Sequence, residues 1–349
     1  MNTSISDFVN AEPLNLASCP GWPKSAVHQF DRQQAIAILA AKAVCRPLLV
    51  CGEPGCGKTQ LARAAAQFLQ MPLACLVVNE RTEAEDLFWR YDALRRLSDA
   101  NSSTGVKEEV AYLSAGPLWR ALNPESAAEY NVYHSAEPYR GEPEGVIRDY
   151  KNGVLLLIDE IDKADRSVPN SLLEALGNYS FEVPYIQDSQ KKRIECDAEK
   201  QPPPLIIITS NNEQTLPPAF LRRCLLLDMK LDDRDEASFV QQLVERGKAH
   251  IKNRFKNGNE SEIISEFENK EIYKKAASML WEKRQSAKRS DSNVLPGQAE
   301  YLDHLEASFL FRCGKPYPMR CPKNWLSCFS CAYRSSTLRQ RLSRPFLNY

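Results

Sequence analysis

The stretch that decides the fold is Gly52-Glu53-Pro54-Gly55-Cys56-Gly57-Lys58-Thr59. An apolar run, residues 47–51, precedes it, and an alanine-rich run, residues 60–66, follows it. A strand, a glycine-rich turn and a helix in this order are the context in which the pattern G-x-x-x-x-G-K-[ST] holds nucleotide phosphates. The glycines let backbone N–H groups converge on phosphate oxygens, and a helix that begins at Lys58 adds the positive end of its dipole. The sequence therefore predicts a phosphate-binding loop over residues 52–59. The alternative is a glycine turn that precedes a helix by chance.

A second motif supplies the carboxylates that such a loop requires. Residues 154–158 form an apolar run typical of a central strand, and Asp159 and Glu160 follow it directly. Ligands of open α/β sheets bind at the carboxyl ends of the strands. We expect Asp159 to bind Mg²⁺ together with the Thr59 hydroxyl. We expect Lys58 to contact the β- and γ-phosphates, and Glu160 to orient or deprotonate the attacking water. Together the two motifs predict binding and hydrolysis of a nucleoside triphosphate.

One amide and two arginines complete the set of candidate catalytic groups. Asn211 follows the apolar run 205–209, where its side chain would bond the γ-phosphate or the attacking water. Asparagine is also common in turns, which is the alternative role. Arg222 and Arg223 stand just before another apolar run, residues 225–229. An arginine stabilises the charge that develops on a transferred phosphoryl group, and a neighbouring subunit can supply it. Adjacent arginines are otherwise typical of a solvated surface.

Length and composition are those of an ordinary globular protein. The chain has 349 residues, of which 43% are hydrophobic, enough for two or three domains with a sizeable core. The formal net charge is zero, so bulk charge predicts no partner. Residues 1–7 lack the features of a signal peptide, and no apolar run approaches the ~20 residues that span a bilayer. Several of the eleven cysteines lie in apolar runs, which favours buried, reduced thiols over disulfides. We therefore expect a soluble, cytoplasmic protein without membrane segments.

The order of the apolar runs predicts an α/β fold, in which a P-loop domain with a parallel sheet is followed by a smaller helical lid. Two apolar runs with a helical segment between them, within residues 47–78, form a βαβ unit, whose strands are parallel. From residue 232 the pattern is helical. The predicted segments are an N-terminal arm or loop (1–22), a nucleotide-binding core (23–230), a helical lid (231–312) and a basic, cysteine-containing tail (313–349).

Four segments of the core carry more specific predictions. Residues 26–45 are expected to form one helix. Residues 80–151 form a long insertion, which is expected to begin with a charged helix from Thr82 to Leu97 and to end in a loop over residues 123–151. Residues 181–204 are expected to form a hairpin with a basic turn.

The motifs stand in the order that is found in AAA+ ATPases, and the chain resembles that family over about residues 26–230. The segments that match Walker A, Walker B, sensor 1 and the arginine finger are Gly52–Thr59, Val154–Glu160, Ile208–Asn211 and Leu216–Cys224. The long insertion, with Ala115–Leu118 ahead of Walker B, is similar to the MoxR branch of the family, and so is Pro217–Cys224.

This resemblance implies a Mg²⁺-dependent ATPase that assembles into a ring, usually a hexamer, and acts as a chaperone-like remodeller of a partner protein. MoxR-type ATPases commonly work with von Willebrand A-domain proteins, which implies such a protein as the partner. The nucleotide would lie between subunits, with Lys58 and Glu160 acting from one subunit and Arg223 from the next. Arg222 is the second choice for this arginine finger. The choice of ATP over GTP rests on the resemblance alone.

Two segments depart from the family pattern. The family usually has a basic sensor 2 residue at the start of a late lid helix, but the similar stretch here, Val294–Leu302, contains no Lys or Arg. The tail beyond Cys313 contains Lys and Arg but no Asp or Glu, which is typical of a solvated appendage or of a segment that binds nucleic acid. Its cysteines include only one C-x-x-C pair, Cys328 and Cys331, so a zinc site is the weaker interpretation.

Two other functions fit parts of the sequence. A nucleic-acid-stimulated NTPase motor would share these motifs and use the basic tail, although the core does not interleave aromatic and basic residues for base stacking. A nucleotide switch or scaffold that hydrolyses slowly would fit the missing sensor 2 residue. Stimulation by DNA or RNA would identify the motor, and the turnover rate together with nucleotide-dependent assembly would identify the switch.

Overall fold

The computed structural model describes residues 3–18, 22, 26–102, 105–130, 150–189, 191–197, 199–255, 261–269, 271–290 and 295–313. The chain divides into two compact units, residues 1–306 and 307–349. Of the second unit, the structure describes only residues 307–313, at the end of the last helix.

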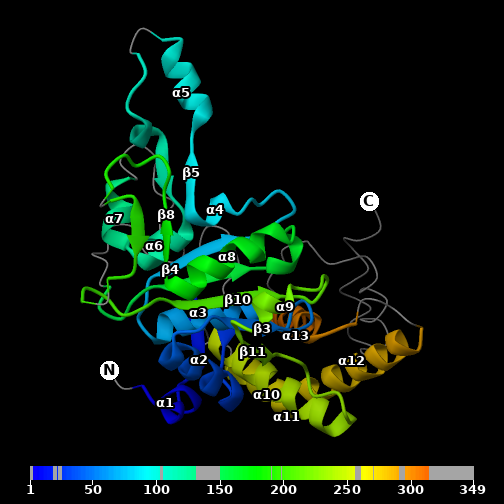
Figure 1. Cartoon of the computed structure of the whole chain (residues 1–349). Helices are drawn as coiled ribbons and strands as arrows, with labels where there is room; N and C mark the ends of the chain where they lie inside the picture. Colours follow the sequence, from blue (N-terminus) through cyan, green and yellow to red (C-terminus); the bar gives the residue numbers. More distant parts are fainter. Residues whose placement is uncertain are drawn as a thin grey trace. The chain divides into compact units, whose positions relative to one another are not determined.

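A parallel sheet of five strands lies at the centre of the first unit (Figure 1). The strands lie in the order β11-β3-β10-β7-β4, and all neighbouring pairs are parallel. Their bounds are Leu48–Cys51 (β3), Leu73–Val77 (β4), Leu155–Asp159 (β7), Leu205–Ser210 (β10) and Leu225–Asp228 (β11). These strands coincide with the apolar runs of the sequence, so the predicted α/β fold with a parallel sheet is confirmed.

Helices cover both faces of this sheet, which explains why its strands are apolar apart from the polar residues at the carboxyl ends of β7, β10 and β11. Successive side chains of a strand point to opposite faces. Leu155 and Leu157 of β7 pack in the cluster that contains α2 (Arg32–Val44) and α3 (Lys58–Phe68). Leu156 and Ile158 pack in the other cluster, with α6 (Pro117–Leu122) and α8 (Ser167–Asn178). Figure 1 shows α3 and α8 on opposite sides of the sheet.

The remaining elements belong to the N-terminal segment, the insertion, the hairpin after α8 and the C-terminal helices. In chain order they are α1 (Ile5–Val9), β1 (Leu14–Leu16), β2 (Ala26–His28), α4 (Glu85–Phe88), β5 (Trp89–Tyr91), α5 (Ala93–Ala100), the 3-10 helix η1 (Glu109–Tyr112), β6 (Leu113–Ala115), α7 (Pro124–Glu129), the 3-10 helix η2 (Ile161–Lys163), β8 (Ser180–Glu182), β9 (Arg193–Glu195), α9 (Pro218–Leu221), α10 (Glu236–Arg254), α11 (Ser261–Asn269), α12 (Ile272–Arg289) and α13 (Gln298–Arg312). Strands β8 and β9 pair antiparallel, so the predicted hairpin is confirmed. Helices α10 to α13 follow the sheet domain as the sequence predicts. No helix among the described residues is long and apolar enough to cross a membrane.

The N-terminal segment contains regular structure, and the prediction of an arm or loop over residues 1–22 is wrong for its described part. Helix α1 begins with a capping box, in which the side chains of Ser4 and Asp7 each accept a hydrogen bond from the other's backbone N–H. Phe8 is fully buried against Phe30 and Phe68, at centroid distances of 4.8 and 4.3 Å. A single buried aromatic residue in a short helix leaves no periodic signal in the sequence.

The helix predicted over residues 26–45 begins only at Arg32. Asp31 caps it, because its carboxylate accepts the backbone N–H of Gln34 at 2.8 Å. Residues 26–28 instead form strand β2, which pairs antiparallel with β1. The pairing partner lies outside the segment, so local periodicity did not reveal it.

The insertion also differs from its prediction. Residues 82–97 do not form one helix, because strand β5 separates α4 from α5 and pairs with β6. The loop predicted over residues 123–151 begins with helix α7, which Asn123 caps by accepting the backbone N–H of Ser126 at 3.0 Å. Residues 131–149 lie outside the described residues. So do residues 314–349, which carry the basic and cysteine-rich part of the predicted tail.

Candidate functional site

A cavity of about 240 Å³ lies where the phosphate loop meets the ends of β7 and β10. Its wall combines residues of the loop and the start of α3, residues that end β7 and β10, and residues of α13. These residues are Pro54, Gly55, Gly57, Lys58, Thr59, Gln60, Asp159, Glu160, Thr209, Asn211, Gln298, Ala299 and Leu302. The parallel sheet explains the gathering, because β10 lies between β3 and β7 and brings their three carboxyl ends together.

The predicted loop has a backbone that requires glycine. Gly55 and Gly57 have φ angles of 78° and 98°, in the left-handed region that other residues avoid. A Cβ atom on Gly52 would lie 2.7 Å from the carbonyl oxygen of Met229. Helix α3 begins directly after Gly57, so its free N–H groups and its dipole face the same loop. The backbone geometry of the loop is therefore compatible with the anion-binding cradle that the sequence predicts.

Lys58 lies at the base of this cradle and is buried, with 6% of its surface exposed. Its ammonium group donates hydrogen bonds to the carbonyl oxygens of Gly52 at 2.8 Å and Glu53 at 2.9 Å. A lysine in the cavity wall supplies the positive charge that nucleotide phosphates require.

Asp159 accepts hydrogen bonds from two threonine hydroxyls at the bottom of the cavity. Thr59 Oγ1 lies 2.9 Å from both carboxylate oxygens, and Thr209 Oγ1 lies 2.6 Å from Oδ1. Burial raises the pKa of Asp159, and the hydrogen bonds from Thr209 and Thr59 oppose that rise without cancelling it. A carboxylate beside a hydroxyl provides the hard oxygen ligands that Mg²⁺ prefers, and a cation would offset the cost of burying the charge. The residues present therefore fit a magnesium ion.

Glu160 lies in the cavity wall with a left-handed backbone, at a φ angle of 63°. The Thr209 hydroxyl fixes this conformation by accepting the backbone N–H of Glu160 at 2.8 Å. The carboxylate accepts a hydrogen bond from Lys163 at 2.7 Å, and both side chains are partly exposed. A strained, non-glycine backbone is a common feature of catalytic positions.

Asn211 also lies in the cavity wall, directly after β10, which lies between β3 and β7 in the sheet. Its backbone N–H donates to Asp162 Oδ2 at 3.0 Å, and the backbone N–H of Glu213 donates to the same oxygen at 2.9 Å. Asp162 is 1% exposed, so it anchors the turn that presents Asn211. The Asn211 amide donates to the Glu213 carboxylate at 3.1 Å.

Arg222 and Arg223 do not contribute to the cavity wall of the described chain. Both side chains are exposed at the end of α9. Their backbone is held by Arg46, whose guanidinium donates to the carbonyl oxygens of Arg222, Arg223 and Cys224. Arg223 also donates to the carbonyl oxygen of Ala219 at 3.3 Å. The structure therefore separates these arginines from the other predicted site residues.

The site includes three polar groups to which the sequence analysis assigned no role. Thr209 joins the two acidic residues, and the available signal in the sequence was its hydroxyl directly after the apolar residues 205–208 of a central strand. Gln298 lies in the cavity wall within the segment that lacks a sensor 2 cation. Arg246, on α10, donates a hydrogen bond to the Gln298 side-chain carbonyl. Among the described residues of the cavity wall, Lys58 is the only cation.

Comparison with known families gives one match that covers just over half of the chain. The sequence profile of the AAA domain (dynein-related subfamily) matches residues 47–224, from the start of the first core strand to the end of the arginine segment. A comparison with curated proteins gives no match.

Solved structures with a similar fold include three proteins of low sequence identity. A protein of Cytophaga hutchinsonii described as an ATPase is 16% identical, with a TM-score of 0.35, and the match covers 65% of this chain and 52% of that one. A RuvB mutant of Thermotoga maritima is 14% identical, with a TM-score of 0.39 and coverages of 81% and 63%. NtrX of Brucella abortus in complex with ATP is 14% identical, with a TM-score of 0.43 and coverages of 88% and 58%. The matches thus span less than two thirds of each of these proteins.

Proposed function

The chain belongs to the AAA family, in its dynein-related subfamily, and on this basis we propose that it is a Mg²⁺-dependent ATPase. The observation that carries the proposal is the composition of the cavity wall. Lys58, Thr59, Asp159, Glu160 and Asn211 come from separate elements and meet around one space beside a glycine cradle. These are the groups that phosphoryl transfer requires, namely an anion cradle, a cation, metal-binding oxygens and a residue that positions water.

Each group has a role in hydrolysis that follows from its position. The backbone N–H groups of the loop and the Lys58 ammonium would bind the phosphates. Asp159 and the Thr59 hydroxyl would hold Mg²⁺, which supplies charge neutralisation at the phosphate oxygens. The Glu160 carboxylate would orient the attacking water and accept its proton, and the Asn211 amide would hold that water or the γ-phosphate.

We further propose that the protein works as a ring, of the hexameric kind that the MoxR resemblance implies. The cavity wall contains no arginine among the described residues, whereas Arg222 and Arg223 are exposed elsewhere. A second copy of the chain would complete the site if its Arg223 reached the nucleotide. On the same resemblance we propose that the ring remodels a partner protein, in particular one with a von Willebrand A domain.

Mixing two inactive variants tests hydrolysis and the shared site together. Glu160→Gln is expected to bind nucleotide but to lose turnover, and Arg223→Ala is expected to lose turnover by ~100-fold or more. A mixture of the two should regain activity, because the Glu160→Gln subunit supplies Arg223 to the intact Glu160 of its neighbour. Arg222→Ala is the matched control and should retain turnover. Full activity of Glu160→Gln would refute the catalytic assignment, and a mixture that stays inactive would refute the shared site.

A second candidate function is a nucleotide switch that assembles on ATP and hydrolyses it slowly. The observation that favours it is Gln298, a neutral residue of α13 in the cavity wall. Two measurements distinguish the switch from the remodelling ATPase. They are the turnover rate and the mass in solution of wild type and Glu160→Gln, with and without Mg·ATP. A nucleotide-dependent ring with steady turnover supports the remodeller, and a ring with negligible turnover supports the switch. Stimulation of turnover by DNA or RNA would instead favour a nucleic-acid motor.

A further inference from the structure

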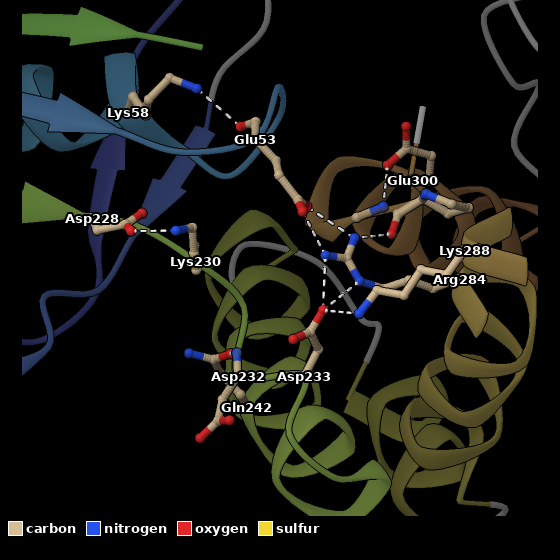
Figure 2. A network of polar contacts seen from close by, with 12 residues as sticks. Glu53, Lys58, Asp228, Lys230, Asp232, Asp233, Gln242, Arg284, Lys288 and Glu300 are labelled. Atoms are coloured by element: carbon tan, nitrogen blue, oxygen red, sulfur yellow. Dashed lines mark hydrogen bonds and ion pairs between the residues drawn. The ribbon is translucent and has the colours of Figure 1, made fainter. Parts of the chain in front are cut away.

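Arg284 is a buried cation on α12 whose hydrogen-bonding capacity is fully used. Only 2% of its surface is exposed. Nη1 donates to Glu53 Oε2 at 2.9 Å and to the carbonyl oxygen of Pro296 at 3.0 Å. Nη2 donates to Glu53 Oε1 at 2.6 Å and to Asp233 Oδ2 at 3.2 Å, which Nε also contacts at 3.3 Å. Every N–H of the guanidinium thus has an acceptor, and Figure 2 shows that these acceptors come from separate segments.

The bidentate partner, Glu53, belongs to the phosphate loop itself. Its side chain extends from the loop to the Arg284 guanidinium, while its backbone carbonyl accepts the hydrogen bond from Lys58 (Figure 2). Glu53 does not line the cavity, unlike Pro54 and Gly55 beside it. Its carboxylate is therefore free to bind the helical region while its backbone shapes the base of the nucleotide site.

The other partners of Arg284 join the helices that follow the sheet domain. Asp233 precedes α10 and also accepts a hydrogen bond from Lys288 at 2.7 Å. Burial raises the pKa of Asp233, but the hydrogen bonds from Lys288 and Arg284 outweigh burial and lower that pKa overall. Pro296 lies just before α13, the helix that contributes Gln298 to the cavity wall. One guanidinium thus connects the phosphate loop with α12 and with the segments that lead into α10 and α13.

Helix α13 meets the same loop at a second point. A Cβ atom on Gly55 would lie 2.8 Å from the Cβ of Ala299, so the helix and the loop are in close contact there. Ala299 and Gly55 are both in the cavity wall. A shift of the loop on nucleotide binding would therefore reach α13 through two contacts, namely that between Gly55 and Ala299 and that through Arg284. Only the second includes a charged, bidentate pair, which fixes the orientation of the two side chains as well as their separation.

We propose that Arg284 is a positioning residue of the nucleotide site, which couples the conformation of the phosphate loop to the position of α12 and α13 through the Glu53 carboxylate. The proposal rests on the proposed nucleotide-binding function. The pair holds the loop against α12 and against the segment that leads into α13, the helix that contributes to the cavity wall. Removing the Glu53 carboxylate leaves a buried guanidinium without its bidentate acceptor.

Hydrogen exchange of the full chain, with and without saturating Mg·ADP, tests this coupling. The variants are Glu53→Gln, which removes the carboxylate charge, and Arg284→Lys, which keeps the charge but cannot form the bidentate pair. Lys288→Gln is the matched control, because Lys288 binds the same Asp233 but does not contact the loop. Thermal unfolding identifies any variant that does not fold.

In wild type and in Lys288→Gln, nucleotide should slow exchange both in residues 52–59 and in residues 298–306. In Glu53→Gln and Arg284→Lys it should slow exchange in residues 52–59 as in wild type but in residues 298–306 to a smaller extent, because the contact between Gly55 and Ala299 remains, and the KM for ATP should rise about tenfold. Protection of residues 298–306 as strong as in wild type in these two variants, or weakened protection in Lys288→Gln, would overturn the proposal. So would wild type in which nucleotide protects the loop alone. Wild type without protection of the loop would instead refute nucleotide binding itself.

Discussion

Replacing Thr209 with valine would remove one hydroxyl from the centre of the candidate site and keep the shape of the side chain. Thr209 is fully buried, and its Oγ1 donates to Asp159 at 2.6 Å while it accepts the backbone N–H of Glu160 at 2.8 Å. The substitution therefore breaks a hydrogen bond to a carboxylate and leaves a backbone N–H without its acceptor. It tests whether this hydroxyl aligns both acidic residues.

The magnitude follows from the two bonds. A hydrogen bond to a charged group contributes about 1.5–3 kcal/mol, and an unsatisfied buried donor costs about 1–3 kcal/mol. Glu160 is only partly buried, so water would compensate some of the second loss. We expect Thr209→Val to lower the free energy of unfolding by about 3 kcal/mol and kcat for ATP by ~10-fold or more. Thr209→Ser, which keeps the hydroxyl and loses one methyl group, should cost about 1 kcal/mol.

The pH dependence gives a second check on the same substitution. Burial raises the pKa of Asp159 above its usual value of 3.8 in the folded state, so the contribution of Asp159 to stability is fully present below pH 3.8 and is lost as pH rises through the folded pKa. The Thr209 hydrogen bond opposes this rise, and its removal raises the pKa further. Thr209→Val should therefore destabilise the protein more near neutral pH than in acid.

Urea unfolding at both pH values and steady-state ATP hydrolysis provide the measurements, with Thr209→Ser as the reference. If valine and serine variants unfold at the same urea concentration and hydrolyse ATP at the same rate, the hydroxyl does not align the acidic residues and the reasoning is wrong.

Two further substitutions test features outside the cavity. The His250 ring and the Arg254 guanidinium lower the pKa of Glu306 from 4.5 to about 2, so its stabilisation is present above 4.5 and is lost as pH falls through the folded value. Glu306→Gln should lower the free energy of unfolding by about 1–2 kcal/mol near neutral pH, allowing for solvent screening, and should have no measurable effect near pH 2. Urea unfolding measures both values, and an equal loss of stability at the two pH values would contradict this assignment. A Cβ atom on Gly116 would lie 2.5 Å from the backbone carbonyl oxygen of Leu87, so Gly116→Ala should cost about 1–3 kcal/mol and lower the thermal unfolding temperature, whereas an unchanged temperature would show that the backbone yields.

Local sequence patterns predicted the part of the site that lies on consecutive residues. Residues 52–59 form a glycine-rich turn before α3, and Asp159, Glu160 and Asn211 line the cavity at the ends of β7 and β10; their roles in binding and hydrolysis stay predictions. Each signal is local. A phosphate loop needs its glycines, lysine and threonine at fixed spacing, and the residues that follow the central strands of a parallel sheet all lie at the same edge of that sheet.

The predictions of local structure were wrong where contacts with another segment of the chain determine whether a helix or a strand forms. Strand β2 and strand β5 interrupt predicted helices because β1 and β6 pair with them. Phe8 is buried because Phe30 and Phe68 surround it. Strand pairing and aromatic packing depend on residues far away in the chain, so they override local helix propensity without leaving a periodic pattern.

The α/β class, the candidate phosphate loop and the acidic residues beside it could be inferred from the sequence alone, because a strand, a turn and a helix carry these groups at fixed spacing. Three contacts became visible only in the folded chain: Thr209 joins Asp159 to Glu160, Arg46 holds the backbone of the segment around Arg222 and Arg223, and Arg284 binds Glu53 of the loop. Arg284 lies 231 positions after Glu53 in the chain. Such contacts exist because folding brings an acceptor to each buried donor, and no local pattern specifies which distant residue will provide it.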